Sequence, residues 1–281
     1  MKNMFTGLAL FVFLFSCPSF AQLTKVWENN TDVKRPECVV YDDENNCLYV
    51  SNFNHNPKNG DLYNDDCVSK FSLDGELIEK EFVSNLTCPT GLCIYNGKLY
   101  IVERFGVVQF DIAAEKVETR YRITGPGFIN DVIADDAGNI YVTVSDKATI
   151  YRISDHTVEK WLESDEIAGV NGIIQDGDRL IVGATGDSCL KSITLNEKKI
   201  DIVARFKSGV LDGIKKYGND YMVSHFEGNI YRVGENGEVT ELLDAREQKM
   251  HCADFEFIEN KGLLIIPTLW RNSIVAYKII Q

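Results

Sequence analysis

Residues with cation-binding side chains recur at one position of this sequence. Each begins a short apolar run, and the set comprises Glu37, Thr90, Asn130 with Asp131, Asn171, Asp212 and Asp254. Carboxylate and amide oxygens are the ligands that hard cations such as Ca²⁺ and Mg²⁺ prefer. Burying a carboxylate is costly unless something offsets its charge. If the fold brings these side chains together, we therefore expect either a cation site or a network of hydrogen bonds to backbone amides and channel water.

An internal repeat brings the set together. Related segments are PECVVYDDENNCLYVSN from Pro36, PTGLCIYNGKLYIVE from Pro89, INDVIADDAGNIYVTV from Ile129, VNGIIQDGDRLIVGA from Val170, LDGIKKYGNDYMVSH from Leu211 and ADFEFIENKGLLIIP from Ala253. Each consists of an apolar strand, a turn rich in Gly, Asn and Asp, and a strand rich in β-branched and aromatic residues. The polar positions are 53, 40, 41, 41 and 42 residues apart. A period of this length indicates a repeat architecture.

Two further strands follow each of the first five units, as in VSKFSLDGELIEKEFV and NIYRVGENGEVTELLD. Six units of four strands predict an all-β protein, a six-bladed β-propeller with four-stranded blades. The sixth unit has three strands and ends at SIVAYKII, so we expect LTKVWEN, at the start of the mature chain, to close the ring. The long first interval contains FNHNPKNGDLYNDDC, which has the composition of a loop. Because the first strand of a blade lines the channel, the polar set should surround one channel mouth.

Residues 1–21 have the features of a signal peptide, with Lys2, the apolar run GLALFVFLF and the small-residue cleavage site SFA. The propeller domain is then 22–281, and no stretch is long enough to span a membrane. We expect an exported protein, periplasmic or secreted. The alternative is a lipoprotein anchored through Cys17, because LFSC loosely resembles a lipobox. Seven cysteines follow residue 21, and a domain of this size favours buried free thiols over disulfides.

The net charge of −13 limits the partners of the chain. A negative surface without clusters of Lys and Arg argues against nucleic acid and anionic membranes, and it is compatible with binding a cation. The sequence has no Gly-x-Ser-x-Gly elbow and no His-Glu-x-x-His motif. Neither a nucleophilic-serine hydrolase of that type nor a zinc enzyme of that type is indicated.

The segments RPECVVYDDENNCLYVSN, FINDVIADDAGNIYVT, VNGIIQDGDRLIVG and LDGIKKYGNDYMVS resemble the blade-opening motifs of the regucalcin/gluconolactonase family of six-bladed propellers. The likeness covers nearly the whole mature chain. It implies one divalent cation held by Glu37, Asn171 and Asp212, with Ca²⁺ first and Mg²⁺, Zn²⁺ or Mn²⁺ as alternatives. It also implies hydrolysis of a small lactone or ester, in which the metal polarises the carbonyl and activates water. Asp212 would then act as the general base.

The resemblance assigns Asn130 to the substrate, where it would orient the ring oxygen or a hydroxyl. Sugar-lactone members of the family tend to carry an Arg two residues before this Asn. This sequence has Phe128 there, which favours a more apolar lactone or ester. Arg104 and Arg271, on loops expected at the same rim, are candidate replacements, although surface salt bridges are the commoner role of such residues. His225 should reach the channel face, either as a substrate contact or as a hydrogen-bonded wall residue.

Two other functions remain open. An exported propeller can bind a peptide, a glycan or a protein of the cell envelope at its rim without catalysis. Phe128, Trp270 and the loop at 55–66 would then form the recognition surface. A condensation like that of strictosidine synthases needs a Glu near the channel, and only Glu37 of the polar set is available for it. The sequence does not indicate an oligomeric state.

Overall fold

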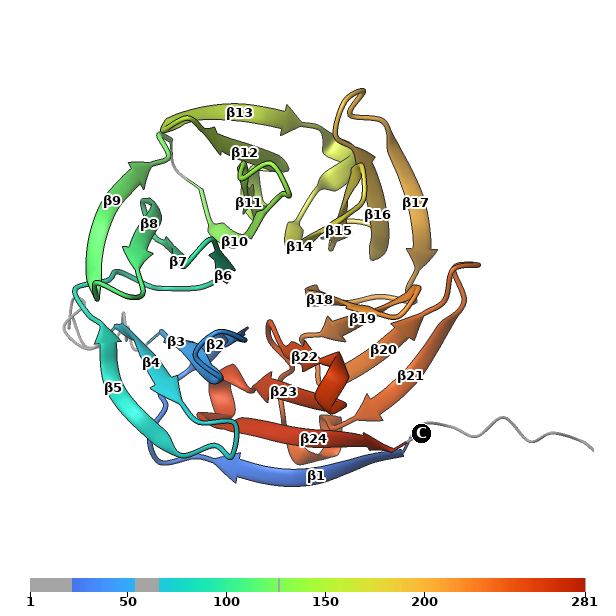
Figure 1. Ribbon diagram of the computed structural model, residues 1–281. Helices are drawn as coiled ribbons and strands as arrows, with labels where there is room; N and C mark the ends of the chain where they lie inside the picture. The colour runs from blue at the N-terminus through green and yellow to red at the C-terminus, as the bar shows by residue number, and fades with distance from the viewer. Residues whose placement is uncertain (1–21, 54–65, 126, 281) are drawn as a thin grey trace, which may run out of the picture.

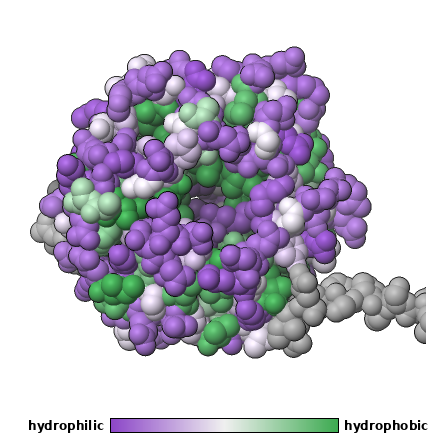
Figure 2. All heavy atoms as spheres, in the orientation of Figure 1, coloured by the Kyte–Doolittle hydropathy of each residue, from purple (hydrophilic) through white to green (hydrophobic). Residues whose placement is uncertain are grey.

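Six antiparallel sheets of four strands form a ring around a central channel in this computed structural model (Figure 1). The structure describes residues 22–53, 66–125 and 127–280. The prediction of an all-β, six-bladed propeller is confirmed. Seen along its axis, the ring has a central hollow with hydrophilic residues inside it (Figure 2).

Each blade runs from the channel outward in chain order, except the last. The innermost strands are β2 (Pro36–Asp42), β6 (Leu92–Tyr95), β10 (Ile129–Ala134), β14 (Val170–Asp176), β18 (Leu211–Tyr217) and β22 (Glu256–Ile258). The second strands are β3 (Cys47–Asn52), β7 (Lys98–Glu103), β11 (Ile140–Val144), β15 (Arg179–Ala184), β19 (Asp220–His225) and β23 (Leu263–Pro267).

The third strands are β4 (Cys67–Phe71), β8 (Gly106–Asp111), β12 (Thr149–Ser154), β16 (Cys189–Thr194), β20 (Asn229–Val233) and β24 (Ile274–Ile280). The outer strands are β5 (Leu77–Val83), β9 (Lys116–Arg122), β13 (Thr157–Glu163), β17 (Ile200–Arg205), β21 (Val239–Asp244) and β1 (Gln22–Asn29). Single-turn 3₁₀ helices lie in loops at η1 (Ser145–Lys147), η2 (Asp165–Ile167), η3 (Arg246–Gln248), η4 (Glu259–Lys261) and η5 (Leu269–Arg271).

The core consists of the layers between neighbouring blades. Inner and second strands are covered on both faces, so β3 is buried at every residue, whereas the outer strand β9 is mostly exposed. Between the first two blades, the ring of Tyr49 stacks on Phe82 at 5.0 Å, and Phe82 meets Phe110 edge to face at 5.3 Å. The β-branched and aromatic composition of the second strands suits this packing between sheets.

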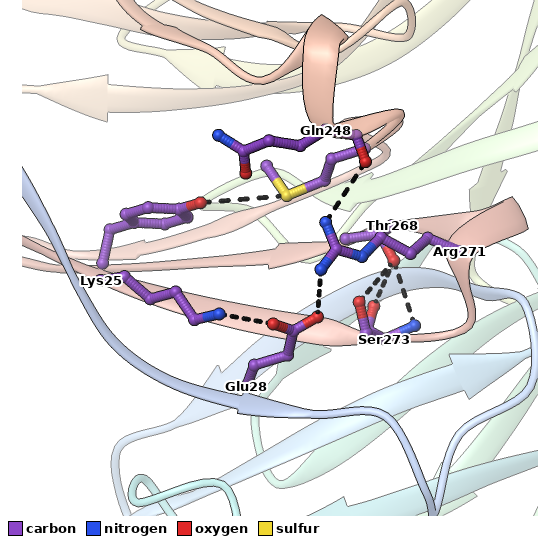
Figure 3. Close-up of polar contacts among 8 residues, drawn as sticks. Lys25, Glu28, Gln248, Thr268, Arg271 and Ser273 are labelled. Atoms are coloured by element: carbon purple, nitrogen blue, oxygen red, sulfur yellow. Dashed lines mark hydrogen bonds and ion pairs between the residues drawn. The ribbon is translucent and has the colours of Figure 1, made fainter.

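The sixth blade is closed by the N-terminal strand. β1 pairs antiparallel with β24, from Gln22 opposite Ile280 to Asn29 opposite Ile274. This confirms the predicted closure. Arg271 links the parts of this closure, since its guanidinium donates to Glu28 Oε1 on β1 (2.9 Å) and to the carbonyl of Gln248 (3.4 Å) (Figure 3).

Export and the leader stay predictions, because residues 1–21 lie outside the described residues. Among the residues that the structure describes, no helix is long and apolar enough to cross a membrane. The seven described cysteines are free and buried, namely Cys38, Cys47, Cys67, Cys88, Cys93, Cys189 and Cys252.

Candidate functional site

A β-bulge occurs at the site-bearing position of four inner strands. In the first blade, Pro36 pairs with Asn52 and Val39 with Val50, so two residues of β2 lie opposite one residue of β3. The same shift occurs in the third, fourth and fifth blades. The bulged pairs are Glu37–Cys38, Asn130–Asp131, Asn171–Gly172 and Asp212–Gly213. Because a bulge re-aims side chains, it allows two consecutive residues to serve the channel instead of every second one.

Hydroxyl groups on the second strand satisfy the backbone at these bulges. Cys38 N–H donates to Ser51 Oγ (2.9 Å), Asp131 N–H to Thr143 Oγ1 (3.0 Å) and Gly213 N–H to Ser224 Oγ (2.7 Å). All three hydroxyl residues are fully buried. A buried N–H that the bulge removes from the ladder would otherwise cost about 1–3 kcal/mol. The sequence thus supplies a hydroxyl partner for the backbone N–H at three of the four bulges.

Glycine next to the polar position lets neighbouring inner strands approach each other. A Cβ on Gly172 would lie 1.9 Å from the Asp212 carbonyl oxygen, and one on Gly91 would lie 2.4 Å from Asp131 Oδ1. Real Cβ atoms do not approach other heavy atoms this closely, so packing at the axis requires the glycines of the Asn171-Gly172 and Thr90-Gly91 pairs. This close approach brings the polar side chains of successive blades together.

The predicted metal ligands Glu37, Asn171 and Asp212 lie where the inner strands start, and we call this end of the channel its outer half. Asn171 Nδ2 donates to Asp212 Oδ1 at 3.0 Å, and both residues are buried. Glu37 Oε2 is buried and has no hydrogen-bond partner. Burial, together with the charges of Asp212, Asp254 and Asp131, raises the pKa of Glu37 well above its usual range. Burial and Asp254 raise the pKa of Asp212 to about 8, although the Asn171 hydrogen bond lowers it. Among the described residues, no positively charged group contributes to either of these two pKa shifts.

Asp254 lies deeper than the sequence pattern suggested. It forms a parallel bridge with Cys38, one residue beyond Glu37, and the Cys38 thiol donates to its Oδ2 at 2.9 Å. The place expected for Asp254 is taken by Ala253, whose N–H bonds the Pro267 carbonyl as Thr90 N–H bonds that of Val102. The acidic side chains of Asp254 and Glu37 suggest that the two residues align. Strand pairing shows that this alignment is wrong by one residue.

The inner half of the channel contains two charged residues that sequence reasoning missed, Lys215 and Glu256. A cavity of about 190 Å³ is lined by Asp131, Asp254, Lys215 and Glu256 together with Tyr41, Cys93 and aliphatic side chains. Asp131 accepts hydrogen bonds from Val132 N–H (2.7 Å) and Ile173 N–H (3.0 Å). Strand alternation could have found Lys215, because it lies two residues after the bulged Gly213 on the same strand face.

The predicted substrate residues lie near the outer half. Asn130 is buried, and its Nδ2 donates to Ser145 Oγ at 3.1 Å. Phe128 directly precedes β10 and is 51% exposed. Arg104 is exposed in the β7–β8 loop, with its guanidinium 5.9 Å from the Phe105 ring. These three positions start or adjoin the same end of the blades, and their roles in substrate binding stay predictions.

His225 and Arg271 are engaged with other parts of the protein. His225 Nδ1 accepts from Glu227 N–H (3.3 Å), so Nε2 carries the proton and donates to the Ser208 carbonyl (2.7 Å). Arg271 forms the salt bridge with Glu28 described above. Both sets of contacts match the structural roles weighed from the sequence. A contact of His225 with substrate stays a prediction.

The predicted metal ligands are of mixed type. Among residues 22–53, 66–125 and 127–280, no group of three or more His, Cys, Asp and Glu side chains is arranged to hold a metal ion. The predicted trio contains two such residues, because its third member, Asn171, is an amide. Its Nδ2 faces Asp212, and cation binding would use its Oδ1. Oxygen-only sets of this kind suit Ca²⁺ and Mg²⁺ better than softer metals.

The ring of blades and the acidic axis define the class, which is a six-bladed β-propeller with a polar site in its channel. Among solved structures, it is similar to a gluconolactonase from Xanthomonas campestris, with 15% identity, 92% of this chain and 90% of that chain covered, and a TM-score of 0.73. It is also similar to a putative gluconolactonase, with 15% identity, 93% of each chain covered and a TM-score of 0.71.

A virginiamycin B lyase from Staphylococcus aureus, solved with quinupristin, has 14% identity and a TM-score of 0.65, with 92% of this chain and 99% of that chain covered. No family model and no curated protein matches the sequence. At these identities the likeness is one of fold. The expected resemblance to gluconolactonases is confirmed at that level, and the same fold is shared with lyases.

Proposed function

We propose that this protein is a divalent-metal-dependent hydrolase of a small lactone or ester, with its site in the outer half of the channel. The observation that carries the proposal is the buried, unpartnered Glu37 Oε2, within electrostatic range of the carboxylates of Asp212, Asp254 and Asp131. Buried polar atoms in folded proteins nearly always have partners, and exceptions mark functional sites or missing ions. Glu37, Asn171 and Asp212 would hold the cation.

The residues present fit such an ion. Two carboxylates and one amide supply the oxygen donors that a hard cation requires, and three protein ligands leave positions open for substrate and water. A bound divalent cation supplies Lewis-acid polarisation of a carbonyl and activation of water. The pKa of Glu37 is raised mainly by burial and then by neighbouring carboxylates, so added positive charge would relieve both effects.

The side chains of the site divide the remaining work. Asp212 would accept a proton from the attacking water, and Asn171 would orient Asp212 through the 3.0 Å hydrogen bond between them. In the balanced reaction, water oxygen bonds to the acyl carbon, the acyl C–O bond breaks, and the departing oxygen receives the proton that Asp212 took. Asn130, held by Ser145, would orient the ring oxygen or a hydroxyl of the substrate.

The rim favours an apolar substrate. Phe105, Phe128 and Trp270 are 54%, 51% and 52% exposed, and they lie on loops that adjoin the starts of the inner strands. Exposed aromatic side chains that share one end of a fold commonly mark a binding surface. A lactone or ester with an aromatic ring or an acyl chain would bury them, whereas a bare sugar lactone would not.

The test is hydrolysis of a lactone and ester panel by purified protein. Activity should be lost with a chelator and restored by Ca²⁺, Mg²⁺, Zn²⁺ or Mn²⁺. Glu37→Gln and Asp212→Asn should each weaken metal binding by at least about 100-fold. Glu81→Gln and Asp201→Asn, exposed on outer strands, serve as controls. If metal content and activity are the same in all four variants, the proposal is wrong.

A second candidate is a non-catalytic propeller that binds a peptide, glycan or envelope protein at the rim. The same exposed aromatic residues favour it. In that case Phe128→Ala and Trp270→Ala would abolish partner binding, and removing the metal would not affect it. Binding that depends on Glu37 and Asp212 would contradict this candidate.

A further inference from the structure

Acidic side chains outnumber basic ones among the described residues of the channel. Glu37, Asp131, Asp212, Asp254 and Glu256 contribute five carboxylates, each with its pKa raised chiefly by burial. Lys215 contributes an ammonium group, and it lies in the inner half. A divalent cation in the outer half would reduce the excess negative charge there. The inner half needs its own source of positive charge.

Lys215 faces the inner cavity, while its neighbour Lys216 contacts a different partner. The Lys215 side chain is 21% exposed, and its Nζ lies 3.8 Å from Glu256 Oε2, with Asp254 and Asp131 within electrostatic range. Lys216 is 38% exposed and pairs with Asp176 at 3.0 Å. Lys215 and Lys216 are thus adjacent lysines in different environments, so the same substitution at each gives a matched pair of variants.

Hydrogen bonds hold the inner carboxylates but leave their charges uncompensated. Glu256 accepts from Tyr41 N–H (3.2 Å) and Phe257 N–H (2.8 Å), and Asp254 accepts from the Cys38 thiol. These donors are neutral. Several carboxylates buried together need a full positive charge nearby in addition to their hydrogen bonds. The Lys215 ammonium supplies it.

We propose that Lys215 is a built-in counter-cation that occupies the position a second hard cation would take among Asp131, Asp254 and Glu256. The channel is thereby restricted to one divalent ion, in its outer half. Burial lowers the pKa of Lys215, but Glu256, Asp254 and Asp131 outweigh that effect and raise it, so the amine stays charged. Without the ammonium, three carboxylates would surround a cavity of about 190 Å³.

The experiment counts bound Ca²⁺ per chain by titration calorimetry and elemental analysis after removal of metal. Lys215→Met is expected to bind one Ca²⁺ more than the unmodified protein. Lys216→Met and Lys215→Arg should bind the same number as the unmodified protein. The double variant Lys215→Met/Glu256→Gln should lose the added site, because one of its carboxylates is gone.

If Lys215→Met is too unstable for calorimetry, thermal unfolding tests the proposal instead. Its midpoint should fall without Ca²⁺ and recover either with added Ca²⁺ or with Glu256→Gln. The proposal is overturned if Lys215→Met binds no more Ca²⁺ than Lys216→Met, or if neither remedy restores its midpoint. The readout is a difference between variants, so it does not depend on the proposed function. If the unmodified protein bound none of Ca²⁺, Mg²⁺, Zn²⁺ and Mn²⁺, the proposed hydrolase would be wrong and this test would still apply.

Discussion

The two halves of the channel contain similar carboxylates in different surroundings. In the outer half, Glu37 Oε2 lacks a partner and Asp212 is bonded to a neutral amide. In the inner half, Asp131 and Glu256 are held by backbone N–H groups, and Lys215 adds a positive charge. The chain itself supplies a positive charge in the inner half, whereas the proposed cation would supply it in the outer half. Such an imbalance distinguishes a binding site from a structural network.

The largest effect expected from this comparison is the loss of the inner charge. Lys215→Met leaves buried carboxylates uncompensated and should lower the free energy of unfolding by about 3–5 kcal/mol. Lys216→Met should change it by less than about 1 kcal/mol, because its pair is partly exposed. Urea unfolding in the presence of chelator measures both values. Equal losses in the two variants would contradict the role of Lys215 as the positive charge of the inner half.

The outer half should respond in the opposite direction. Asp212→Asn removes a buried carboxyl group whose pKa is raised by folding and can keep the hydrogen bond with Asn171, so the chelated protein at neutral pH should become more stable by about 1–3 kcal/mol. Added Ca²⁺ should stabilise the unmodified protein by about 2.7 kcal/mol at 100 times its Kd and leave Asp212→Asn unchanged. A less stable Asp212→Asn in chelator would show that the outer half, too, is balanced by the chain.

The bulges that carry the site should have a smaller effect. Ser224 Oγ accepts from Gly213 N–H and donates to the Ala253 carbonyl at 2.8 Å. Ser224→Ala leaves both groups buried without this partner and should cost about 1–2 kcal/mol in urea unfolding. Ser84→Ala, on an exposed loop, is the control. A neutral result would mean that the hydroxyl does not support the bulge.

The smallest effect is expected at the perimeter, where charges are exposed. Arg271 is 35% exposed in its salt bridge with Glu28, so Arg271→Ala should lower the free energy of unfolding by less than about 1 kcal/mol. High salt should reduce the difference, because exposed ion pairs are screened. A loss as large as that of Lys215→Met would show that ring closure depends on this contact.

The fold was predictable because the repeat is visible in the residues themselves. Period, turn composition and the incomplete last unit led to six blades and to closure by β1, as found. The outer site was predictable in part, since Asn171 and Asp212 are in direct contact and Glu37 is within electrostatic range of Asp212. The repeat fixes these positions relative to one another.

The inner half was harder to predict because it depends on strand register. Asp254 was placed one residue too far out, since ADFEF offers an acidic residue near the expected position and residue type alone cannot fix pairing. Lys215 and Glu256 lie 41 residues apart, at one position of the repeat, but the other four blades have apolar residues or Cys there, so no recurring charge marks the position. The hydroxyls of Ser51, Thr143 and Ser224 recur at one strand position, and that regularity is a signal for the bulges.

The closure of the sixth blade also bears on how the molecule is made. A chain synthesised from its amino end presents β1 first, but the partner β24 is the last strand to emerge. Until then β1 has an unpaired edge, which is a template for wrong associations. The sixth blade can form only after β22, β23 and β24 have been synthesised, so closure of the ring has to wait for the last of its strands.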